Sequence, residues 1–127
     1  MVAEGSGPMS VGLDGEGFVR LRWAPGVKIS GDLAREAVVM VERICAGRRR
    51  PMLVDMTGTG ALTRAARVVF AEESFASKIA LLGKSAVDRV IANFALGVSP
   101  VPVPTRFFTA EPAALAWLRN VGDERKA

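Results

Sequence analysis

The stretch "PMLVDMTGTGALTRAARVVF", residues 51–70, decides the fold class of this chain. Residues 51–56 form a short apolar run of the kind that makes buried parallel strands. A loop of threonine and glycine follows, and Thr63 then stands at the N-cap position of a helix. We predict a helix over residues 64–73 with an inward face made by Ala66, Val69 and Phe70. The stretch is therefore one strand–loop–helix unit.

Two strands and a long helix are predicted before this unit. Residues 9–17 and the alternating residues 18–24 form a pair of strands, and Asp14-Gly15 supplies the hairpin turn between them. Ser30 caps the helix that follows, and Gly47 is its natural stop. The helix is amphipathic, with a buried stripe made by Leu33, Ala37, Met40, Val41 and Ile44.

A second strand–helix unit is predicted after residue 77. Residues 78–83 form a short buried strand, and Ser85 and Asp88 have the spacing of a capping box. The helix that they begin is expected to end at Gly97. Its apolar face is predicted to contain Val87, Val90, Ile91, Phe94 and Ala95.

The last strand–helix unit follows an extended connector with prolines at positions 100, 102 and 104. Residues 105–108 form the strand, and Thr109 is expected to cap the final helix. Pro112 is tolerated in its first turn. We expect Leu115, Leu118 and Val121 on the buried side of this helix, with Trp117 in the core.

Repeated alternation of strands and helices predicts an α/β fold with a mainly parallel sheet and an N-terminal hairpin. Crossovers between parallel strands are right-handed, so the chain is expected to wind as a right-handed β-α superhelix. We divide the chain into a flexible N-terminal arm at residues 1–8, a single domain at residues 9–122, and a charged tail at residues 123–127.

Composition indicates a cytoplasmic protein. No apolar run approaches the roughly 18 residues that a membrane span needs. The single cysteine, Cys45, forms no internal disulfide, which fits a reducing compartment. The excess of 13 arginines over 4 lysines is typical of a GC-rich bacterial genome.

The net charge of +4 raises the question of nucleic-acid binding. The cluster formed by Arg48, Arg49 and Arg50 is the only one, and no aromatic residues are interleaved with it to stack on bases. Scattered, solvated arginines explain the charge better, and we do not expect a nucleic-acid partner.

Catalytic chemistry has little support in the sequence. The chain has no histidine, which excludes histidine bases, Ser-His and Cys-His nucleophile pairs, and histidine zinc sites. The run Gly83-Lys84-Ser85 matches the end of a phosphate-binding loop, but position 78 is lysine where that motif has glycine. We therefore expect no enzyme activity, no cofactor and no metal, and paired carboxylates remain the only catalytic alternative.

Four segments carry a family resemblance: "RRRPMLVDMTG", "LTRAAR", "AVDRVIANFALG" and "PTRFFTAEPAALAWL". In this order and spacing the chain resembles small uncharacterised bacterial proteins with a STAS-like (SpoIIAA-like) fold, related to anti-sigma-factor antagonists. The resemblance covers about residues 9–122. It implies helices largely on one face of the sheet, and regulation through protein contacts or small-ligand binding in place of catalysis.

One departure from this family concerns its phosphorylation motif. The antagonists carry an Asp-Ser-Ser-Gly-type motif at the start of the helix after the "LVD" strand, whereas this chain reads "TGTGALTRAAR" there. Thr63 occupies the equivalent cap position, where a phosphate would meet a helix N-terminus and pair with Arg64 or Arg67. A plain helix cap is the interpretation that we prefer for Thr63.

The expected function is that of an interaction module that binds a protein partner or itself. Ligands of parallel sheets favour the loops beyond the carboxyl ends of the strands. The candidate binding residues there are Asp55, Thr57, Lys84 and Ser85, with Thr63, Arg64 and Arg67 nearby. A small-ligand site at the same edge is the alternative. The apolar composition and an open sheet edge also predict a homodimer.

Overall fold

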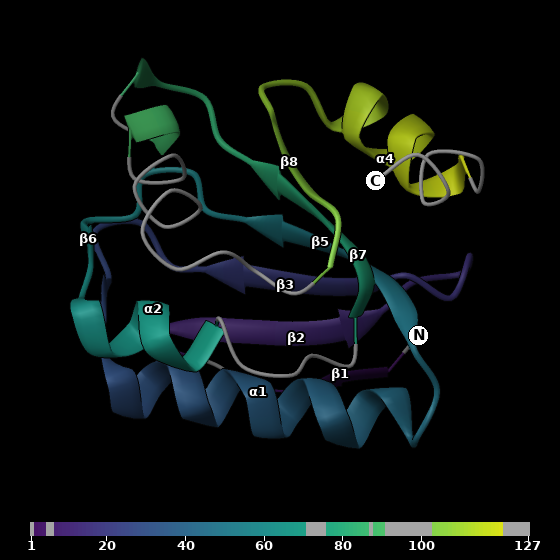
Figure 1. Cartoon of the computed structure of the whole chain (residues 1–127), viewed down its shortest axis with the longest axis horizontal. Helices are drawn as coiled ribbons and strands as arrows, with labels where there is room; N and C mark the ends of the chain where they lie inside the picture. Colours follow the sequence, from purple (N-terminus) through teal and green to yellow (C-terminus); the bar gives the residue numbers. More distant parts are fainter. Residues whose placement is uncertain (1, 5–6, 71–75, 87, 91–102, 121–127) are drawn as a thin grey trace.

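The computed structural model describes residues 2–4, 7–70, 76–86, 88–90 and 103–120 (Figure 1). A six-stranded sheet with the strand order β1-β2-β3-β5-β7-β8 forms its centre. The strands are β1 (Val2–Glu4), β2 (Met9–Leu13), β3 (Val19–Trp23), β5 (Arg50–Asp55), β7 (Ala76–Leu82) and β8 (Thr105–Phe108). The strands from β3 to β8 are parallel neighbours, which confirms the predicted α/β fold with a mainly parallel sheet.

The N-terminal hairpin is confirmed, and the sheet extends one strand beyond it. Strands β2 and β3 are antiparallel, and the Asp14 carboxylate accepts hydrogen bonds from the amides of Glu16 and Phe18 in the turn. Strand β1 pairs antiparallel with β2, so residues 2–4 are sheet, although we expected a loose arm there. The segment of residues 2–4 is too short for an alternation of apolar and polar residues to indicate a strand.

Helix α1 (Gly31–Cys45) follows the sequence prediction closely. The Ser30 hydroxyl accepts a hydrogen bond from the Leu33 amide at 3.1 Å and caps the helix, and Gly47 has a positive φ beyond its end. Within the predicted stripe, Ala37, Met40 and Val41 are buried, and Leu33 and Ile44 are partly buried.

Helix α2 (Arg64–Phe70) is capped by Thr63, whose hydroxyl accepts a hydrogen bond from the Ala66 amide at 3.1 Å. The predicted continuation to residue 73 lies outside the described residues. Ala66 and Val69 are buried as expected, but Arg67 is also buried, with 7% of its surface exposed. Helical periodicity of apolar residues does not predict the burial of Arg67, because this criterion assigns charged residues to the solvent-facing side of a helix.

A small second sheet joins the starts of the two helices. Strands β4 (Lys28–Ile29) and β6 (Ala61–Leu62) are parallel and lead directly into α1 and α2. The two helices begin side by side, and a Cβ on Gly31 would lie 2.8 Å from the Ala65 Cβ. Strands of two residues leave no periodicity to detect, so the sequence did not predict this sheet.

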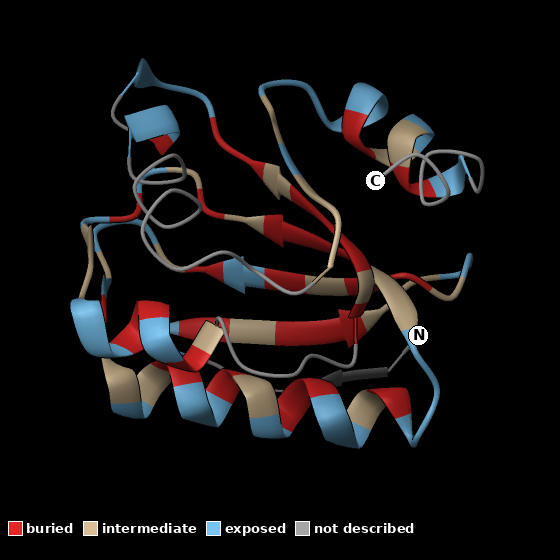
Figure 2. Cartoon of the chain, viewed as in Figure 1, coloured by how far each residue is buried: buried red, intermediate tan, exposed pale blue. Residues whose placement is uncertain are grey.

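The helices lie on both faces of the sheet. Helices α1 and α2 share one face, whereas α4 (Glu111–Arg119) packs on β5, β7 and β8 from the other (Figure 1). The one-sided arrangement implied by the family resemblance therefore holds for α1 and α2 and fails for α4. Buried residues accordingly run along the central strands and one side of α1 (Figure 2).

Three details in the C-terminal half correct the sequence prediction. The N-cap of α4 is Ala110, which makes no side-chain cap bond, so Thr109 does not cap the helix; Pro112 lies in the first turn as predicted. Val90, predicted to face inward, is 65% exposed. Trp117, predicted in the core, is only partly buried.

Several predicted features fall outside the described residues: Val87, Ile91, Phe94, Ala95, Gly97, Val121, the prolines at 100 and 102, and the charged tail. Among the helices that are described, none is long and apolar enough to cross a membrane.

Candidate functional site

The carboxyl ends of β3, β5 and β7 meet at one edge of the sheet, where three loops come together. These loops are residues 24–27 after β3, residues 56–60 after β5, and residues 83–85 after β7. Such an edge is where parallel sheets place ligands. It is therefore the candidate site, which we call the carboxyl-end loops.

Asp88 holds two of these loops together. Its carboxylate accepts hydrogen bonds from the amides of Gly58 at 3.2 Å, Lys84 at 2.9 Å and Ser85 at 3.3 Å, and the residue is 2% exposed. The Ser85 hydroxyl accepts a bond from the Asp88 amide at 3.1 Å, which confirms the predicted capping box. The sequence predicted the cap from local spacing. It did not predict the hydrogen bond from the Gly58 amide to Asp88, because that contact depends on tertiary structure.

Gly58 connects all three loops. Its amide donates to Asp88, and its carbonyl accepts a hydrogen bond from the Gly26 amide at 2.7 Å. The φ of Gly58 is +72°, in the region that side chains rarely adopt, and Pro25 lies against it. Hydrogen bonds therefore connect the three loops to one another.

Two further polar side chains, one at the end of β5 and one in the loop after it, also bond within the protein. The Asp55 carboxylate accepts a hydrogen bond from the Thr57 amide at 3.0 Å, and its other oxygen lies 3.7 Å from Arg22 Nε. The buried Thr59 hydroxyl donates to the Met56 carbonyl at 2.7 Å. Arg22 has no signal in the sequence beyond its place in an alternating strand, and the parallel register of β3 and β5 sets it opposite Asp55.

The structure brings together four of the predicted site residues and separates the other three. Asp55 ends β5 and Thr57 lies in the loop after it, which Asp88 ties to the exposed Lys84 and Ser85. Thr63, Arg64 and Arg67 belong to the start of α2, beyond β6. Arg64 is exposed there, and Arg67 is buried, so of these two only Arg64 is at the surface to meet a group attached to Thr63.

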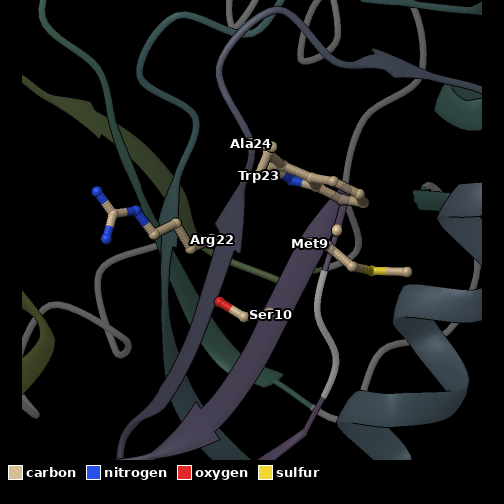
Figure 3. Close-up of a pocket in the computed structure, with 6 residues that line it drawn as sticks. Met9, Ser10, Arg22, Trp23 and Ala24 are labelled. Carbon is tan, nitrogen blue, oxygen red and sulfur yellow. The ribbon is translucent and has the colours of Figure 1, made fainter.

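A shallow pocket lies at the same end of β3. It has a volume of about 200 Å³ and is lined by Gly7, Met9, Ser10, Arg22, Trp23 and Ala24. Ser10 and Arg22 are directed to one side of the strands, and Met9 and Trp23 to the other (Figure 3). Pockets for small molecules have volumes of about 300–1,000 Å³. This pocket is too small to enclose such a ligand.

The titratable groups with shifted pKa values lie away from the carboxyl-end loops. Burial works against the charge of Asp14, but the Phe18 amide, Arg20 and the Glu16 amide together hold its pKa below the ordinary value. The hydrogen bond from Arg119 lowers the pKa of Glu16. Burial raises the pKa of the Cys45 thiol, which is therefore an unreactive core group. No cluster able to hold a metal occurs among the residues described.

Comparison with known proteins places the chain in a family. The model of a domain of unknown function, DUF7793, matches residues 12–122. The chain belongs to this family. No curated protein matches it.

Solved structures resemble this DUF7793 chain. An uncharacterised protein of the DUF3478 family with a SpoIIAA-like fold, from Shewanella loihica PV-4, has a TM-score of 0.59 and 16% identity, covering 87% of this chain and 91% of its own. A protein of unknown function from Arthrobacter sp. FB24 is 47% identical, with coverage of 91% and 97% and a TM-score of 0.38. The first similarity shows that the DUF7793 chain has a SpoIIAA-like fold, in agreement with the sequence prediction.

Proposed function

We propose that this chain is a non-catalytic, cytoplasmic interaction module that binds a protein partner, or a second copy of itself, at the carboxyl-end loops. The observation that carries the proposal is the use of Asp88. Its carboxylate is buried and accepts bonds from three loop amides, so it holds the surface in shape and is not offered to a substrate.

The neighbouring groups support the same interpretation. The Asp55 carboxylate bonds to the Thr57 amide and lies beside Arg22, and the Thr59 hydroxyl bonds to the Met56 carbonyl. Neither group is therefore part of an acid–base pair facing a cavity, as far as the described residues of this edge go. The nearby pocket of about 200 Å³ is too small for a carried ligand. A rigid edge that presents exposed Lys84 and Ser85 suits contact with another protein surface. The resemblance of the sequence to relatives of anti-sigma-factor antagonists favours the same proposal.

Site-specific photo-crosslinking in the native cell tests this proposal. A photoreactive residue at Lys84 should give one discrete crosslinked product, because this position lies on the proposed contact surface. The control replaces Glu36, which is exposed on α1 away from the loops. Equal crosslinking at both positions, or none at Lys84, would contradict the proposal, and mass spectrometry of the product distinguishes a second copy from another protein.

We also propose a homodimer, which light scattering at micromolar concentration can test. The mean hydropathy of +0.25 is high for a small chain, and we expect a mass near twice 13.5 kDa. The sheet face opposite α1 and α2 is less available for this contact, since α4 packs on β5, β7 and β8 there and Arg20 and Arg22 form ion pairs. A single species near 13.5 kDa would refute self-association and leave a different protein as the partner.

A further inference from the structure

Helix α4 is held by a buried lysine. Lys78 on β7 is 1% exposed, and its ammonium donates to the carbonyls of Trp117 and Asn120, both at 2.7 Å. These carbonyls belong to the end of α4, where the helix dipole favours a positive charge. The ammonium also lies 4.4 Å from the centre of the Trp117 ring, a distance typical of cation–π contact.

Ion pairs tether both ends of α4 to the β2–β3 hairpin. At the C-terminal end, Arg119 binds both carboxylate oxygens of Glu16, with Nε 2.6 Å from Oε2. At the N-terminal end, Arg20 Nη1 lies 3.4 Å from a Glu111 oxygen. The four side chains are 36–50% exposed, so each pair is weak and is screened by salt.

The apolar contact beneath α4 is small and separate from the main core. Only Ala114 and Leu118 of the helix are buried, and Leu115 and Trp117 are partly buried. The sheet side of this cluster consists of Phe18, Leu53, Ala80 and Leu82. Helices α1 and α2 pack on a different cluster across the sheet, so loss of α4 would leave their packing intact.

We propose that α4 is a lid that opens as a unit of its own, with Lys78 as its latch. The closed state removes the ammonium from water, and the two α4 carbonyls compensate for that loss. When α4 lifts, the ammonium is solvated again, which lowers the cost of opening. Opening exposes the apolar strip of Leu53, Ala80 and Leu82 while the sheet, α1 and α2 stay folded. This inference does not depend on the proposed binding surface.

Amide hydrogen exchange of the full chain, followed by mass spectrometry, tests the lid. In the unaltered protein, amides of residues 111–119 should exchange at least about tenfold faster than those of β5 and α1, because they exchange through the local opening. Lys78→Met should accelerate exchange in α4 by a further factor of about ten and leave β5 and α1 unchanged. Lys28→Met, which removes an exposed lysine outside the candidate site, is the matched control and should change neither region.

Two outcomes would overturn the proposal. One is exchange of α4 at the same rate as the core in the unaltered protein. The other is equal acceleration of all segments by Lys78→Met, which would make Lys78 a general stabilising residue. If Lys78→Met does not fold, the unaltered protein in about 1 M salt decides the question, because screening of the end ion pairs should speed α4 relative to α1. An unchanged ratio of the two rates would then refute the lid.

Discussion

The two faces of the sheet are covered by different means. On the face of α1 and α2, strand β3 presents Val19, Leu21 and Trp23, all buried in one large apolar cluster. On the opposite face, the same strand presents Arg20 and Arg22, and Phe18, the residue just before the strand, lies in a separate apolar cluster. Residues 18–23 therefore supply a continuous core to one side and a mixture of apolar and charged contacts to the other.

This difference separates the stability of the domain from the attachment of α4. Apolar burial on the first face contributes about 25 cal/mol per Å² and is insensitive to salt and moderate pH. The second face depends on Lys78, on exposed ion pairs and on a small cluster. We therefore expect the first face to determine the free energy of global unfolding, and the second to determine local opening of α4.

Trp23 on one face and Trp117 on the other allow the two faces to be compared directly, and the largest effect on stability is expected at Trp23. Trp23 is 3% exposed on the α1 face, with its ring edge-on to Phe70 at 6.3 Å. Trp23→Ala should lower the free energy of unfolding by about 3–5 kcal/mol, because it leaves a cavity in the main core. Urea denaturation monitored by circular dichroism measures this loss. A loss below about 1 kcal/mol would show that the cluster beneath α1 and α2 does not dominate the stability of the domain.

Trp117→Ala should have a smaller effect. Trp117 is partly buried, packs on Phe108 at 5.6 Å and contacts Lys78. We expect a loss of about 1–2 kcal/mol, since part of the ring already faces water. The same denaturation experiment gives the value, and a loss equal to that of Trp23→Ala would show that both faces contribute alike.

The smallest effect is expected at Asp14, on the hairpin that borders α4. Its pKa lies below the ordinary value of 3.8 in the folded chain, so the stabilisation is complete above pH 3.8 and is lost as the pH falls through the folded value. Asp14→Asn should cost at most about 1 kcal/mol near pH 7, because its partner Arg20 is partly exposed. Unfolding curves from pH 7 down to pH 3 should show this cost shrinking. A cost that is independent of pH would assign the effect to hydrogen-bond geometry instead of charge.

The contrast between the faces also explains what the sequence could predict. The stripe through Ala37, Met40 and Val41 follows helix periodicity, and the caps at Ser30 and Thr63 are local patterns, so the first face was predictable. The sequence identifies Lys78 only as a residue that does not fit the phosphate-binding motif. Its role in holding α4 has no local signal, because its acceptors at Trp117 and Asn120 lie about 40 residues away in the chain. Periodicity carries no information on such contacts.

The candidate site also contains some features that local sequence patterns predict and others that depend on long-range contacts. Ser85 and Asp88 were predictable as a local capping box, but the bond from Gly58 to Asp88 spans 30 residues. Arg22 was seen only as one member of an alternating strand, and its position beside Asp55 follows from the parallel register. Burial of Arg67 has no sequence signal, since a charged residue in a short helix is normally assigned to solvent.

The close approach of Gly31 to Ala65 has a consequence for how this family varies. The two positions share one small space at the start of α1 and α2, and a Cβ at position 31 would lie 2.8 Å from the Cβ at position 65. A larger side chain at either position therefore requires a smaller one at the other. Among DUF7793 sequences we therefore expect positions 31 and 65 to covary. The combined volume of the two side chains should stay nearly constant, although the residues are 34 positions apart in the chain.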